Sequence, residues 1–249
     1  MTLSCRWAAL AMTLLLAACG GDKGVKSDSS QLSPGELYVQ IAAEYYRLGD
    51  IEPALKNAQK ALEEDPNNAQ AHNVIATIYQ QLRQPEQAEK HFRTALGLAP
   101  NDSYLLMAWG NFLCDRGDYA GAAAQYQQAL ANPLFNAPWM AETRAGICGR
   151  RAGQIAGAEQ ALRRALSANP GYAPALIEMA ELEHAQGRNP SAKSYLERYL
   201  AAGGRGPKAL LLGVRIERAL GSRQSASRYE KLLRQHYPDA PEVLSLREP

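Results

Sequence analysis

From residue 35 onward, apolar and polar residues recur at helical spacing, and the pattern repeats about every 34 residues. In most units a bulky apolar residue precedes a small one, as in Ile41-Ala42, Ile75-Ala76, Trp109-Gly110 and Met179-Ala180. Later in each unit one position is always alanine, at Ala54, Ala88, Ala122, Ala158, Ala192 and Ala226. Small residues let two helices approach closely, and each apolar stripe must be buried against a neighbour. The pattern therefore predicts a stack of helical hairpins with one continuous core.

Glycine and proline mark the expected ends of these helices. The turn inside five of the units has a glycine, at Gly49, Gly117, Gly153, Gly187 and Gly221, whereas Arg83 stands there in the second unit. Proline lacks the N–H that continues a helix. We therefore expect the second helix of a unit to stop before Pro66, Pro100, Pro170 and Pro238. The last unit is the most degenerate, with Gly213-Val214 where the bulky-then-small pair is expected.

Together these positions resemble the tetratricopeptide repeat, whose pattern runs W-x2-L-G-x2-Y, A-x3-F, then A and P. The resemblance implies an all-α protein, a right-handed superhelix of about six helix-turn-helix repeats over residues 35–240. Residues 241–249 are too few for a full capping helix and are expected to form a C-terminal tail. Such stacks offer a curved surface to another protein and rarely carry out chemistry.

The N-terminal residues form a separate element. Residues 1–18 have one arginine and a short apolar run, which predicts a secretory signal and not a membrane span. The ending Leu16-Ala17-Ala18-Cys19 resembles the bacterial lipobox, which implies acyl chains on Cys19; an ordinary signal peptide cleaved near Ala18 is the alternative. Gly20 replaces the aspartate of the inner-membrane retention signal, so the predicted location is the periplasmic leaflet of the outer membrane. Residues 19–34 read as the lipidated cysteine and a flexible tether.

Charge and motif content indicate neither an enzyme nor a nucleic-acid-binding protein. The net charge of +2 falls close to zero once Arg6 leaves with the signal. His72, His91, His184 and His236 show no metal-site spacing, and no nucleophile or phosphate-binding motif is found. We therefore expect no cofactor, no metal and no small-molecule substrate.

Two cysteines remain for the folded domain. Cys5 leaves with the signal and Cys19 is used for lipidation, so Cys114 and Cys148 are left in an oxidising compartment. They fall on the first helices of consecutive repeats, three and four, which are neighbours in such a stack. A disulfide is therefore predicted; two buried thiols that pack as small hydrophobic groups are the alternative.

The segment around these cysteines is the most specific part of the sequence. It contains N-F-L-C at 111–114, A-N-P-L-F at 131–135 followed by Pro138, and G-I-C at 146–148. This block resembles the PilF/PilW family of type IV pilus biogenesis and stability lipoproteins. The resemblance implies a pilotin, which promotes the outer-membrane localisation and multimerisation of the pilus secretin. The partners would then be the secretin subunit and, through the acyl chains, the outer membrane.

The partner-binding groove is expected along positions 2, 5, 9 and 12 of each first helix, where the first three repeats hold polar, largely uncharged and partly aromatic residues. We predict that Tyr46, Asn73, Tyr104 and Asn111 contact the partner, although these residues could also form only a solvated wall. Leu134 and Phe135, on the two-residue insertion between repeats three and four, are a second candidate patch; alternatively they fill the gap between these repeats.

Two alternative functions would require the same membrane anchor and binding groove. One is a general periplasmic scaffold for another envelope assembly machine. The other is a subunit that holds and regulates a periplasmic enzyme, such as a peptidoglycan hydrolase, at the membrane. The block from Cys114 to Cys148 favours the pilotin over both.

Overall fold

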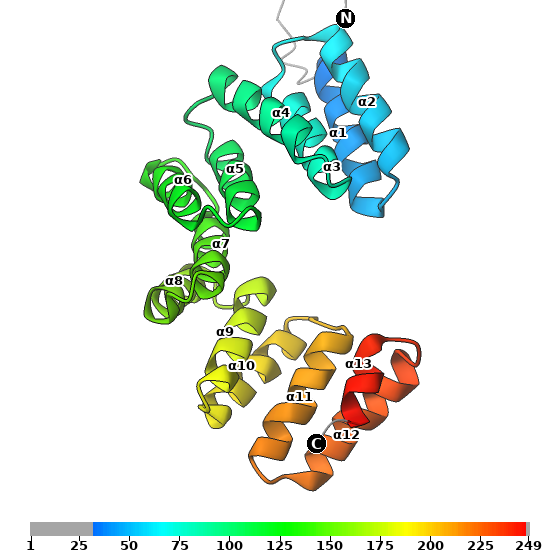
Figure 1. The fold of residues 1–249 in the computed structure, drawn as a ribbon, viewed down its shortest axis with the longest axis vertical. Coiled ribbons are helices and arrows are strands. Elements are labelled where there is room, and N and C mark those ends of the chain that lie inside the picture. Colours follow the sequence, from blue (N-terminus) through cyan, green and yellow to red (C-terminus); the bar gives the residue numbers. More distant parts are fainter. Residues whose placement is uncertain (1–31, 248–249) are drawn as a thin grey trace, which may run out of the picture. The chain divides into compact units, whose positions relative to one another are not determined.

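The computed structural model describes residues 32–247, which fold into helices and turns without strands. Twelve helices pair into six consecutive hairpins, and a short helix and a 3₁₀ turn follow (Figure 1). Their bounds are α1 Pro34–Leu48, α2 Ile51–Glu64, α3 Ala69–Gln81, α4 Pro85–Leu98, α5 Ser103–Asp115, α6 Tyr119–Ala131, α7 Pro138–Arg151, α8 Ile155–Ala168, α9 Ala173–Ala185, α10 Asn189–Ala201, α11 Pro207–Ala219, α12 Arg223–His236, α13 Pro241–Leu244 and η1 Ser245–Arg247. The predicted signal, the lipidation site Cys19 and the tether up to residue 31 lie outside the described residues.

The hairpins stack in chain order. Within each hairpin the first helix contacts the second. The first helix also contacts the first helix of the next hairpin, from α1 with α3 to α9 with α11. The first helices α1, α3, α5, α7, α9 and α11 therefore form one continuous layer within the described residues. This is the arrangement of a tetratricopeptide superhelix, and it confirms the predicted fold class.

The turns inside the hairpins all use a left-handed residue. The five predicted turn glycines have φ between 73° and 88°. Arg83, which replaces glycine in the second hairpin, has φ 57° and is the one non-glycine residue of the described chain with positive φ. The hairpin therefore keeps its turn geometry despite the substitution, at the steric cost that a Cβ carries in this region.

The small residues of the first helices are contact points for the second helices. In the second helices, the alanines that recur once per unit are at most 3% exposed: Ala54, Ala88, Ala122, Ala158, Ala192 and Ala226. On the first helices, a Cβ added to Gly110 would lie 2.7 Å from the ring of Tyr126, and one on Gly213 would lie 2.8 Å from the ring of Tyr229. Each ring belongs to the residue sixteen positions after its glycine. The bulky-then-small pair of the last unit is therefore Leu212-Gly213, one residue earlier than the sequence register placed it.

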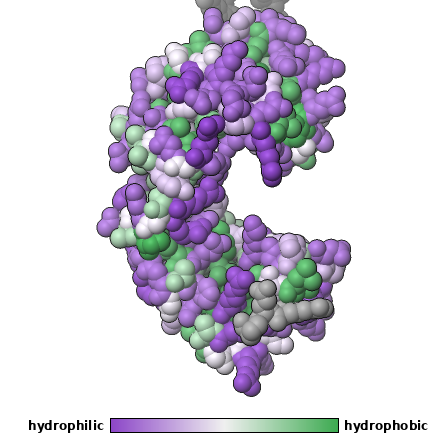
Figure 2. All heavy atoms as spheres, viewed as in Figure 1, coloured by the Kyte–Doolittle hydropathy of each residue, from purple (hydrophilic) through white to green (hydrophobic). Residues whose placement is uncertain are grey.

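The end of the stack is covered by residues beyond α12. In the segment expected to be a tail, α13 and η1 pack on α11, and Leu246 is buried against Leu210, Val214 and Leu233. The cover is short, because α13 has four residues and η1 has three. On the face shown in Figure 2 the surface is mainly hydrophilic, because the apolar stripes are used between hairpins.

Candidate partner-binding site

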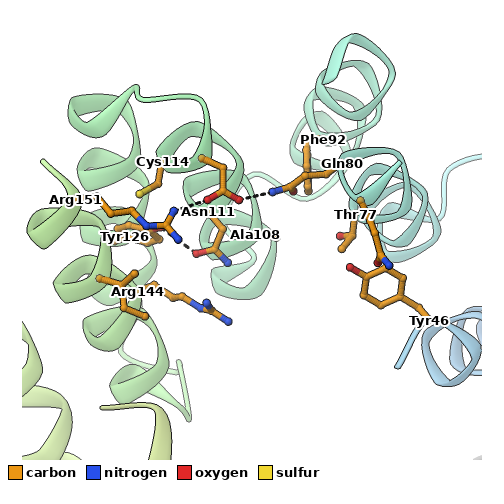
Figure 3. Close-up of a pocket in the computed structure, with 13 residues that line it drawn as sticks. Tyr46, Thr77, Gln80, Phe92, Ala108, Asn111, Cys114, Tyr126, Arg144 and Arg151 are labelled. Carbon is orange, nitrogen blue, oxygen red and sulfur yellow. Dashed lines mark hydrogen bonds and ion pairs between the residues drawn. The ribbon is translucent and has the colours of Figure 1, made fainter. Parts of the chain in front are cut away.

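A cavity of about 540 Å³ opens along the first four hairpins. Most of its wall comes from first helices: Tyr46 of α1, Thr77 and Gln80 of α3, Asn111 of α5 and Arg144 of α7 (Figure 3). Side chains of α4 and α6 contribute where they pass between the first helices. We call this the first-helix cavity. It is the kind of surface that a repeat stack offers to a segment of another protein.

A chain of hydrogen bonds crosses this cavity from α3 to α7. Gln80 Nε2 donates to Asp115 Oδ2 at 2.7 Å, and Arg151 Nη1 donates to Asp115 Oδ1 at 2.5 Å. Both side chains of the Arg151–Asp115 ion pair are about half exposed, so the pair adds little free energy of folding. Its effect is geometric, because both carboxylate oxygens of Asp115 are occupied.

The wall between α5 and α6 is fixed by a buried tyrosine. Tyr126 is 2% exposed, and its hydroxyl donates to Asn111 Oδ1 at 3.0 Å. Burial raises the pKa of Tyr126 far above its usual range, so the phenol stays protonated and remains a donor. The amide oxygen of Asn111 is thereby used, and its Nδ2 is left to face the cavity.

The structure brings together two of the four predicted groove residues. Tyr46 and Asn111 both line the first-helix cavity, whereas Asn73 and Tyr104 do not. Asn73 Oδ1 is buried and has no hydrogen-bond partner among the described residues. Tyr104 turns toward the inserted segment, where its hydroxyl donates to Asn136 Oδ1 at 2.7 Å.

The expectation of an uncharged wall needs correction, because the cavity contains Asp115, Arg144 and Arg151. Asp115 follows the last position considered in the third repeat, and both arginines belong to the fourth repeat. With the turn glycines Gly117 and Gly153 aligned, Arg144 and Arg151 correspond to Ala108 and Asp115, which are outside positions 2, 5, 9 and 12 of a first helix. In α7, aligned on its turn glycine Gly153, the same four positions hold Met140, Thr143, Ile147 and Arg150, of which only Ile147 lines the cavity.

The two residues of the second candidate patch, in the inserted segment between α6 and α7, have different environments. Phe135 is 8% exposed, and its ring lies edge-on to Tyr104 with centroids 5.3 Å apart. It belongs to the same apolar cluster as Cys114 and Cys148. Leu134, its neighbour in the chain, is 87% exposed. Phe135 therefore fills the gap between repeats three and four, and only Leu134 is accessible to a partner.

Cys114 and Cys148 are joined by a disulfide in the structure, with their Cα atoms 5.9 Å apart. The bond connects α5 to α7, and Cys114 also lines the first-helix cavity. The disulfide therefore holds the helix that carries Asn111 and Asp115 against the helix that carries Arg144 and Arg151.

Two further groups of titratable side chains lie outside this cavity. His72 of α3 and His91 of α4 are in contact through their Nδ1 atoms at 2.9 Å. On α7 and α9, an Arg150 Nη2 donates to Glu178 Oε2 at 2.8 Å and to Glu181 Oε2 at 3.2 Å. Residues 32–247 hold no group of three or more metal-binding side chains, and none of their helices is long and apolar enough to span a bilayer.

Comparison with known proteins identifies the repeats and a set of relatives. One tetratricopeptide repeat model matches residues 45–109 and 150–216, and another matches residues 107–173. The type IV pilus assembly protein PilF of Pseudomonas aeruginosa is 26% identical over 230 residues, which are 92% of this chain and 91% of the relative. A solved structure of the same organism's PilF covers 86% of this chain and 96% of its own, with 26% identity and a TM-score of 0.73.

The structure of PilW, described as a widely conserved type IV pilus biogenesis factor, is similar over nearly its whole length. It is 34% identical, with a TM-score of 0.76, and the similarity covers 85% of this chain and 97% of that one. These relatives support a role in type IV pilus biogenesis, and repeats of this kind bind protein partners. The chain thus belongs to the tetratricopeptide repeat family, within the group of type IV pilus biogenesis factors that includes PilF and PilW.

Proposed function

We propose that this protein is an outer-membrane lipoprotein that binds the type IV pilus secretin and promotes its localisation and multimerisation. The observation that carries the proposal is the 34% identity to PilW over 97% of that chain. The family-specific block from Asn111 to Cys148 adds support, because in this structure it forms one wall of a cavity suited to a protein segment.

In this mechanism the anchor and the repeats act together. Acyl chains on Cys19 fix the protein to the periplasmic leaflet, and more than one chain makes such anchoring stable. The first-helix cavity binds a segment of the secretin subunit. Tethering then raises the local concentration of bound subunits at the membrane where the ring must assemble, without any new contact between them. No covalent step is involved.

The test is an immunoblot for heat- and detergent-resistant secretin multimers in outer-membrane fractions. It compares wild type, a deletion strain, and the deletion complemented with either the native gene or Cys19→Ala. Multimers should be lost in the deletion and restored by the native gene, and Cys19→Ala should restore fewer of them at equal protein level.

Unchanged multimers in the deletion strain would refute the secretin role. That result would favour the general-scaffold function. Co-purification with a peptidoglycan hydrolase, together with a cell-separation defect and intact pili, would favour the regulator. The native-gene complementation is the control for effects on neighbouring genes.

A further inference from the structure

The charges of the first-helix cavity are not balanced. Its charged side chains are Asp115, Arg144 and Arg151, which give a net charge of one positive unit. Asp115 is neutralised by Arg151, and its two carboxylate oxygens accept hydrogen bonds from Arg151 and Gln80. No carboxylate within residues 32–247 lies at ion-pair distance from Arg144, although other arginines of the same hairpin are paired, such as Arg164 with Glu142. The excess charge is therefore carried by Arg144.

Arg144 is exposed on α7, and in Figure 3 it extends into the open space of the cavity, away from the Arg151–Asp115 pair. Tyr46 and Thr77 lie on the opposite side of this space. Its positive charge acts on the buried Tyr126, where it partly offsets the rise in pKa caused by burial. Arg144 therefore offers an exposed positive charge that a ligand in the cavity can reach.

The remaining polar groups around Arg144 include several donors that are not used within the described residues. Asn111 accepts from Tyr126 through Oδ1, which leaves the two N–H groups of Nδ2. The hydroxyl of Tyr46 and the amide of Gln81 line the same space without a side-chain hydrogen bond in the described chain. Arginine has five donors and no acceptor. A ligand with acceptors and negative charge would match this set, whereas a cationic ligand would face Arg144 and find Asp115 occupied.

We infer that the first-helix cavity recognises an aspartate or glutamate side chain of a partner protein segment, with Arg144 as the group that pairs with its carboxylate. The inference rests on the proposed function only in taking a protein segment as the ligand. It specifies the chemistry of that segment: an acidic side chain at one position, with polar backbone groups on either side reaching Asn111, Gln81 and Tyr46.

The experiment uses the purified full chain in detergent and a random library of short peptides with blocked ends, so that no terminal carboxylate contributes. Selected peptides are labelled, and their affinities are measured by fluorescence anisotropy. Each selected peptide is compared with the version in which its acidic residue is replaced by the amide. The protein variants are Arg144→Gln and, as matched control, Arg228→Gln, which removes an exposed arginine of α12 far along the chain from the cavity.

Selected peptides should be enriched in aspartate or glutamate, and the acid-to-amide change should weaken binding to the native chain about tenfold, as expected for the loss of one charge-assisted hydrogen bond. With Arg144→Gln the acidic and amide peptides should bind equally. With Arg228→Gln the discrimination should stay as in the native chain. Unchanged thermal unfolding of Arg144→Gln would exclude a folding effect, because this side chain has no ion pair to lose.

Three results would overturn the inference: enrichment of lysine and arginine in the selected peptides, an unchanged preference for acid over amide in Arg144→Gln, or no peptide that binds the native chain. These outcomes are separate from the fate of the proposed function, which is decided by secretin multimers in the deletion strain. Acid-selective binding through Arg144 together with unchanged multimers would retain the acidic ligand and reject the secretin.

Discussion

Two neighbouring residues of the inserted segment should respond in opposite ways to truncation. Phe135 is 8% exposed and Leu134 is 87% exposed. We predict that Phe135→Ala strongly lowers the free energy of unfolding, whereas Leu134→Ala leaves it nearly unchanged. The two variants remove apolar side chains from adjacent positions of one loop, so each is the matched control for the other.

The magnitude follows from what each side chain touches. Truncating a buried phenylalanine typically costs about 3–5 kcal/mol, from lost burial and from the cavity left behind. Because the segment around Phe135 lies between hairpins and can partly relax, we expect about 3 kcal/mol. The edge-on contact with Tyr104, at 5.3 Å between centroids, accounts for part of this cost. Truncation of the exposed Leu134 should stay within about 0.5 kcal/mol.

The measurement is urea unfolding of the purified chain, followed by circular dichroism, with m values compared between variants. A double-mutant cycle with Tyr104→Phe and Tyr104→Ala would separate the ring contact from the hydrogen bond to Asn136. If Phe135→Ala cost less than about 1 kcal/mol, or Leu134→Ala cost as much as Phe135→Ala, the assignment of Phe135 as a filler between repeats would be refuted.

Three further predictions concern stability. The disulfide links residues 34 positions apart, so Cys148→Ala should lower the unfolding free energy by about 3–4 kcal/mol in the chain-entropy model. In urea unfolding, a reducing agent should lower the unfolding free energy of the native chain by the same amount. Gly110→Ala should lower the unfolding free energy by about 1–3 kcal/mol, because the new Cβ would lie 2.7 Å from the buried ring of Tyr126. Gly97→Ala should raise it slightly, because a Cβ there meets nothing within 4 Å. Equal effects of the two substitutions would refute the packing argument. Burial and the neighbouring His72 lower the pKa of His91. Its contribution to stability should therefore be complete above the ordinary histidine pKa of about 6.5 and be lost progressively as the pH falls below that value. Thermal unfolding of His91→Gln should show a smaller loss of stability on acidification, and an identical loss would contradict the assignment.

Most of the fold could be predicted because the same residue pattern recurs in each of the six repeats. The alanine of the second helix appears six times, and all six copies are buried. Each hairpin contacts mainly itself and its neighbours, so a local pattern is enough to define it. The prediction failed where the pattern is weakest: in the last repeat the small residue is Gly213, and the register could be read only from its contact with Tyr229.

The site was less predictable than the fold. A positional rule for first helices found Tyr46 and Asn111 in the cavity, because their spacing fixes the face they share. It missed Arg144, which corresponds to Ala108 of α5 when the turn glycines are aligned; neither residue is at one of the four positions of the rule, although both line the cavity. The different burial of Leu134 and Phe135 could not be decided from the sequence either, since the direction of adjacent side chains in a loop depends on the path of the backbone.

The most family-specific block of the sequence also makes physical sense as one structural piece. In a plain repeat stack, α5 and α7 would be held only by the small residues and apolar contacts that every hairpin has. Here the disulfide and Phe135 are added to the same interface, in a single apolar cluster. Cys114 is a member of that cluster and of the cavity wall. A covalent link at this place fixes the separation between the donors of α5 and the arginines of α7, which general hairpin packing alone would leave free to vary. The block therefore contributes more to the shape of the binding cavity than to the existence of the fold.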